Sequence, residues 1–120
     1  MRAQLKALDS ADAPGGDIRA FEPEDAEDFR LAVTATIGPA GLEGEELFQF
    51  TVCSAARLAR QPLPKGFAFQ RHTLVLDKWD PSLIERAIGD LCLRTEGEEW
   101  HEIAVKLSRF GGWEFEDYRP

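Results

Sequence analysis

The sequence is poor in the residues that build metal centres, disulfide frameworks and nucleotide sites. Its 120 residues include two cysteines, Cys53 and Cys92, and two histidines, and these do not follow a zinc-ligand spacing. Each cysteine stands among apolar neighbours, which indicates buried thiols in a cytosolic chain, although a bridge between them stays open. Neither a phosphate-binding loop nor a dinucleotide fingerprint occurs. We therefore predict no metal site and no cofactor.

Basic residues are also scarce. The chain has 14 Lys and Arg residues against 22 Asp and Glu residues, for a net charge of -8. This excess argues against binding to nucleic acid, because phosphates have to be met by Lys and Arg. It suits a basic protein partner, whose approach an acidic field accelerates. The alternative is that the charge serves solubility alone.

Long apolar runs are absent as well. No stretch of about 18 uncharged apolar residues occurs, so the sequence predicts no membrane span. The opening residues, MRAQLKALDS, alternate polar and apolar side chains and lack the apolar core of a secretion signal. We predict a cytoplasmic protein.

The sequence also lacks recognisable combinations of catalytic residues. His72 lies inside a strand pattern and His101 lies near the start of a helical one, and neither stands beside a nucleophile in a recognisable setting. We predict no catalytic residue and no enzymatic activity. The abundance of carboxylates leaves one enzymatic alternative, a small carboxylate-dependent hydrolase.

The first two thirds of the chain carry strand patterns. Apolar residues alternate with polar ones over 2–8, 29–37 and 46–54, and a glycine-rich turn over 38–44 joins the last two into an antiparallel hairpin. A short helix is expected over 55–61, followed by a loop and a further strand over 67–77.

The last third turns helical. Asp80 and Pro81 form a start signal for a helix whose apolar stripe continues to Cys92. Thr95 and Glu98 have the spacing of a capping box, which predicts a second helix, ended by a double glycine at 111–112. The alternation in WEFEDY, 113–118, predicts a C-terminal strand or arm with Trp113 and Phe115 facing the core.

These elements predict one domain over 1–120 of the α+β class. We expect an antiparallel sheet of about four or more strands, with two C-terminal helices packed on one face and a short C-terminal strand or arm.

Three stretches also form a recognisable set: IGPAGLEGEELFQFTVCS at 37–54, EEWHEIAVKLSRFG at 98–111 and WEFEDY at 113–118. In this order, in an acidic chain of this length, they resemble the immunity-protein-8 family of bacterial polymorphic toxin systems. The resemblance implies a non-enzymatic protein that binds a cognate toxin domain in the cytoplasm of the producing cell. It also implies that the bound protein blocks the toxin's active site or a surface near it. A basic, nuclease-like toxin would suit the acidic charge.

The residues that would meet such a toxin are acids and one tyrosine. The candidates are the C-terminal group Glu114, Glu116, Asp117 and Tyr118, the hairpin group Glu43, Glu45 and Glu46, and, as a third option, the acidic run 22–28. Other motif residues are expected to be structural, for turn geometry or for the core: Gly38, Gly41, Gly44, Trp100, Trp113 and Phe115.

Two questions stay open at this level. The chain could instead be a structural or adaptor module of a secretion-linked complex, with no inhibitory role. A homodimer is also open, because a long strand at a free sheet edge would invite self-pairing.

Overall fold

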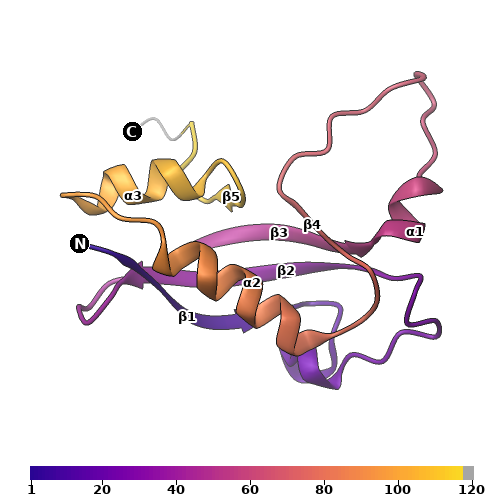
Figure 1. The fold of residues 1–120 in the computed structure, drawn as a ribbon, viewed down its shortest axis with the longest axis horizontal. Helices are drawn as coiled ribbons and strands as arrows, with labels where there is room; N and C mark the ends of the chain where they lie inside the picture. Colours follow the sequence, from indigo (N-terminus) through magenta and orange to yellow (C-terminus); the bar gives the residue numbers. More distant parts are fainter. Residues whose placement is uncertain (118–120) are drawn as a thin grey trace.

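Five strands form one sheet in the computed structural model, which describes residues 1–117 (Figure 1). The strand order is β1-β2-β3-β4, and β5 also pairs with β3. The sheet and the helices that follow it confirm the α+β class and the short C-terminal strand. The strands are β1 Ala3–Asp9, β2 Arg30–Pro39, β3 Glu46–Ser54, β4 Thr73–Leu76 and β5 Gly112–Trp113; the helices are α1 Ala55–Ala59, α2 Pro81–Leu93 and α3 Trp100–Leu107; and two 3-10 turns, η1 Pro14–Gly16 and η2 Ile18–Ala20, follow β1.

The β2–β3 hairpin confirms the alternation seen in the sequence. The two strands pair antiparallel, with Val33 opposite Phe50 and Ala35 opposite Phe48. Their alternate side chains are buried because one face of the sheet lies under the helices, while the intervening residues face outward. The inward residues of the hairpin and of the residue that precedes it are Phe29, Leu31, Val33, Ala35, Ile37, Phe48, Phe50 and Val52.

The strand expected over 67–77 is shorter in the structure, and its expected first half is wrong. β4 covers only Thr73–Leu76, and it runs parallel to β3, whereas the other paired strands run antiparallel. Residues 67–72 would have to pair farther back along β3, beside Phe48 and Gln49, but β5 already pairs there. His72, expected in the strand, instead has a left-handed φ of 55° at the bend before β4.

Helix α2 begins as the sequence indicates. The Asp80 carboxylate accepts hydrogen bonds from the backbone N–H groups of Ser82 (3.0 Å) and Leu83 (3.3 Å), and Pro81 occupies the first turn. In Figure 1, α2 lies across the sheet, and it packs against β1. Its apolar stripe supplies Ile84, Ile88, Leu91 and Cys92 to the core.

The capping box expected at Thr95 and Glu98 is wrong. The Thr95 hydroxyl donates to the Leu91 carbonyl (2.6 Å) and so closes α2 rather than opening α3. Helix α3 begins later, at Trp100, and its first turn is held by the Glu102 carboxylate, which accepts from the Glu98 N–H (3.0 Å). That bond, followed by the charge of Lys106, lowers the pKa of Glu102.

Both helices bury their apolar faces in the same core as the sheet. Ile103, Ala104 and Leu107 of α3 join the residues of α2, β2 and β3 in one cluster. The cysteines are buried and free, so the bridge that the sequence left open is not formed. Burial raises the pKa of Cys92 to about 12 and raises that of Cys53 as well.

The double glycine lets the chain pass close to β3. A Cβ atom on Gly111 would lie 2.6 Å from the Phe50 ring, so this position has no room for a side chain. The expected C-terminal strand or arm is present as the short strand β5, after which the Glu116 N–H donates to the Trp113 carbonyl (3.0 Å) and turns the chain. Phe115, expected in the core, is 43% exposed.

Candidate protein-binding site

The start of β3 brings together two of the acidic groups singled out in the sequence. The Glu114 backbone N–H donates to the Leu47 carbonyl (3.1 Å), and its carboxylate accepts from the Leu47 N–H (3.0 Å). Glu46, the neighbour of Leu47, belongs to the hairpin group. Glu114 therefore holds the C-terminal segment on the edge of β3, which is a structural task.

Glu46 also serves the fold. Its carboxylate accepts hydrogen bonds from the indole N–H groups of Trp100, in α3, and Trp113, in β5, the latter at 3.2 Å. A half-buried indole N–H needs an acceptor, and one carboxylate supplies both. Glu46 thereby fastens two tryptophans from separate elements to the first residue of β3.

An open hollow of about 560 Å³ lies over this contact. We refer to it as the tryptophan hollow. The Trp113 ring contacts the ring of His101 at 5.6 Å and that of Phe115 at 6.1 Å between centroids, both edge to face. Aromatic side chains that are rigidly held yet exposed are typical anchors for a protein partner. The hollow is lined by Glu46, Trp100, His101, Trp113, Phe115 and Asp117.

Unpaired carboxylates lie at one point of this hollow and on the hairpin tip. Glu43, Glu45 and Asp117 are exposed and have no ion pair or side-chain hydrogen bond within residues 1–117. Glu116 differs, because it accepts a hydrogen bond from Arg71 (3.2 Å). Tyr118 lies outside the described residues. The free acids are therefore available to a basic partner, while Glu46, Glu114 and Glu116 are engaged.

The motif glycines are explained by the hairpin tip. Gly41 and Gly44 have positive φ values of 72° and 106°, which favour glycine. Gly38 is limited by space instead, because a Cβ atom there would lie 2.0 Å from the Gly44 carbonyl oxygen. Lys6 of β1 donates to the carbonyls of Leu42 (2.7 Å) and Gly44 (3.0 Å), which ties the tip to the sheet.

Sequence reasoning missed a second hollow, of about 500 Å³, on the outer face of the sheet beside α1. We refer to it as the arginine hollow. Its floor comes from β2, β3 and β4, and its walls come from α1 and from the loop that leads to β4. No local motif could reveal it, because its arginines come from separate segments of an acidic chain. They are Arg30, Arg57, Arg60 and Arg71.

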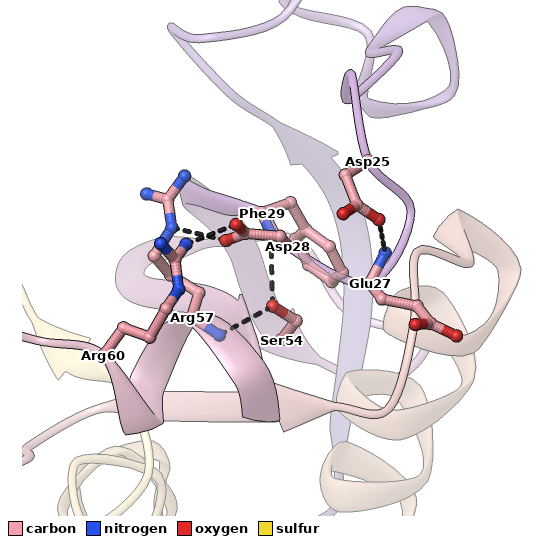
Figure 2. A network of polar contacts seen from close by, with 7 residues as sticks. All are labelled: Asp25, Glu27, Asp28, Phe29, Ser54, Arg57 and Arg60. Atoms are coloured by element: carbon pink, nitrogen blue, oxygen red, sulfur yellow. Dashed lines mark hydrogen bonds and ion pairs between the residues drawn. The ribbon is translucent and has the colours of Figure 1, made fainter.

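Asp28 organises one wall of the arginine hollow (Figure 2). Its carboxylate accepts from Arg57 (2.8 Å) and from Arg60, and these two hydrogen bonds lower its pKa. Buried Ser54 supports the wall from beneath, because its hydroxyl oxygen accepts from the N–H groups of Phe29 (3.1 Å) and Arg57 (3.2 Å). The acidic run 22–28 thus ends in a structural carboxylate.

The lowered pKa of Asp28 predicts a stability effect at acid pH. Ionised Asp28 stabilises the folded state above its usual pKa of about 4, and this contribution is lost as the pH falls through the lower folded value. We expect the stability difference between wild type and Asp28→Asn to be full near pH 6 and to decrease as the pH falls below about 4. Urea unfolding at a series of pH values measures it. Glu24→Gln changes an exposed acid of the same run, and its stability relative to wild type should not change with pH in this way. A stability difference between wild type and Asp28→Asn that stays constant over the pH series would contradict the role assigned to Asp28.

Residues 1–117 lack the features of two other classes of site. No group of three or more His, Cys, Asp or Glu side chains in that part of the chain is placed to hold a metal ion. Within the same residues, no helix has the length and apolar character needed to cross a membrane.

Aromatic side chains gathered at an open surface hollow have a composition that is enriched in protein–protein interfaces. A comparison with protein-family models matches residues 3–118 to the model described as Immunity protein 8. The chain belongs to the Immunity protein 8 family, as the three sequence stretches indicated. Membership indicates an immunity protein of polymorphic toxin systems and implies a toxin protein as its partner. Neither the curated proteins nor the solved structures contain a match.

Proposed function

We propose that this protein binds a cognate bacterial toxin domain in the cytoplasm and neutralises it by occupying the toxin's active site or a surface near it. The observation that carries the proposal is the family match over residues 3–118. The protein acts as a binding partner and transforms no substrate. Its net charge of -8 suits a basic, nuclease-like toxin, because a negative surface can replace the phosphates that such a toxin binds.

The tryptophan hollow supports this function because its aromatic side chains and the nearby carboxylates can play two different roles in binding. Its aromatic side chains are held in place by Glu46 and supply the apolar anchors, which dominate the affinity of most interfaces. The free carboxylates Glu43, Glu45 and Asp117 accelerate encounter with a basic surface and orient it. The tryptophans are held by the fold and provide contact area, whereas the three carboxylates have no partner among residues 1–117 and can pair with a basic surface.

Coexpression tests neutralisation itself. The toxin encoded beside this protein should kill cells that lack the protein and spare cells that make it. Continued killing in the presence of the folded protein at matched expression would contradict the proposed function.

Charge reversal tests the site. The variant Glu43→Lys/Glu45→Lys/Asp117→Lys should weaken toxin binding by about 10- to 100-fold, mainly through a slower association rate, and should reduce its dependence on salt. The matched control is Asp9→Lys/Asp77→Lys/Asp90→Lys, which makes the same charge change at exposed acids outside the candidate groups. Stopped-flow or biosensor kinetics measure both. Equal losses in the two variants would show that only net charge matters.

A further inference from the structure

The arginine hollow has hydrogen-bond donors that the fold does not use. Arg57 and Arg60 each donate to Asp28, and Arg71 donates to Glu116, while Arg30 has no side-chain hydrogen bond or ion pair among residues 1–117. A guanidinium group carries a fork of several N–H donors, so each of these side chains keeps free ones. None of the described residues that line the hollow is acidic. The hollow therefore offers positive donors without a carboxylate in its own described lining.

Two of these arginines, Arg57 and Arg60, are held in place before any ligand arrives. Asp28 draws the guanidinium groups of Arg57 and Arg60 together, and Figure 2 shows both converging on its carboxylate. The buried hydroxyl of Ser54 fixes the first turn of α1 to the start of β2. Charges that are already ordered lose little conformational entropy on binding, which favours affinity.

One wall of the hollow is aromatic and fully open to solvent. Phe69 lines the hollow and is 88% exposed, and its ring contacts that of Phe67, itself 63% exposed, at 6.4 Å. Both belong to the connection between α1 and β4, which rises from the end of the sheet as a long loop (Figure 1). Long loops without secondary structure are often functional, and an exposed pair of phenylalanines beside arginines has the composition of a protein-binding hot spot.

We propose that the arginine hollow receives an acidic segment of a protein partner. Carboxylates of the segment bind the guanidinium forks, whose planar geometry matches two carboxylate oxygens at once, and an apolar side chain packs on Phe69. A protein fits better than a nucleic acid, because the net charge of -8 repels a continuous polyanion while a short acidic segment meets only the local positive charge.

The two hollows are neighbours. Glu116 lies between Phe115 and Asp117 of the tryptophan hollow and pairs with Arg71 of the arginine hollow. A partner that spans both meets aromatic anchors flanked by negative charge at one end and by positive charge at the other. Opposite charges in a fixed arrangement select one orientation and reject partners with the reverse pattern.

A peptide titration tests the arginine hollow without a toxin. The probe is a short capped peptide of Glu and Asp with one central Phe, and the readout is the NMR signals of the arginine Nε–H groups. We expect the signals of Arg30, Arg57, Arg60 and Arg71 to shift. The variant Arg30→Gln/Arg71→Gln should bind the peptide at least about tenfold more weakly. The matched control, Arg86→Gln/Arg94→Gln, removes equal charge from exposed positions at α2 and its end and should bind like wild type.

Several outcomes would overturn the proposal. Equal weakening in both double variants, or equal shifts at all exposed arginines, would show only general attraction. If no arginine Nε–H signal shifted at millimolar peptide, the hollow would not be a binding site for acidic segments. Tighter binding of an oligothymidine at the same signals would assign the hollow to nucleic acid. Arg30→Gln alone guards against a folding defect, because Arg30 makes no side-chain hydrogen bond or ion pair within residues 1–117. Since no toxin takes part, a failure here leaves the coexpression test of neutralisation unaffected.

Discussion

Gly38→Ala should lower the free energy of unfolding by about 3 kcal/mol, the largest effect that we expect from a single added methyl group in this protein. The new Cβ atom would lie 2.0 Å from the Gly44 carbonyl oxygen and 3.0 Å from the Lys6 side chain. The first contact is with backbone, which cannot rotate away as a side chain can. The hairpin tip would have to move, and the hydrogen bond from Lys6 to the Gly44 carbonyl would move with it. Urea unfolding followed by circular dichroism measures the loss.

Two other glycines act as controls for this prediction. Gly41→Ala should lower the free energy of unfolding by only about 1 kcal/mol, because a Cβ atom there meets no atom within 4 Å and only the positive φ of 72° opposes it. Gly89→Ala, inside α2 and also in open space, should raise it by about 0.5–1 kcal/mol. If Gly38→Ala were as mild as Gly41→Ala, the close approach at the hairpin tip would not exist.

Glu46→Ala should lower the free energy of unfolding by about 3 kcal/mol and should shift tryptophan fluorescence to longer wavelength. The change removes the acceptor of two indole N–H groups, those of Trp100 and Trp113, and hydrogen bonds to a charged group contribute about 1.5–3 kcal/mol each. The half-buried indoles would then turn toward water. Chemical unfolding and an emission spectrum of the folded protein measure the two effects.

The matched control is the neighbouring acid. Glu45→Ala removes an exposed carboxylate without a side-chain hydrogen bond in residues 1–117, and should change stability by less than about 0.5 kcal/mol. Glu46→Gln keeps one acceptor oxygen and should fall between the two. If Glu46→Ala and Glu45→Ala were equally stable, Glu46 would have no structural role. It would then be a surface acid available to a partner, as the sequence suggested.

The structural role of Glu46 changes how the acidic candidates are to be tested. Charge reversal at Glu46 or Glu114 would disturb the contacts of β3 with α3 and β5, so a loss of binding could arise from unfolding alone. Glu43, Glu45 and Asp117 have no such contacts among the described residues, and variants there report on the surface itself.

Much of the fold could be predicted because its signals are local. Alternation over 29–37 and 46–54 places every second side chain on one face, and the structure buries these residues as the hairpin predicts. Asp80 and Pro81 start α2 through contacts within one turn. The capping box at Thr95 was predicted wrongly because a Thr three residues before a Glu fits that motif. In the structure, the Thr95 hydroxyl instead donates to the carbonyl of Leu91, four residues earlier in the chain.

By itself, the sequence determined the α+β class, the hairpin, the buried faces of both long helices and the family, since each depends on periodicity or on motifs within a short stretch. Only the tertiary structure decided that β4 and β5 share one edge of β3, because that competition joins segments far apart in the chain. The same is true of the carboxylate between two tryptophans and of the arginines gathered beside Asp28. Such sites depend on which side chains meet in space, and spacing along one strand or helix carries no information about that.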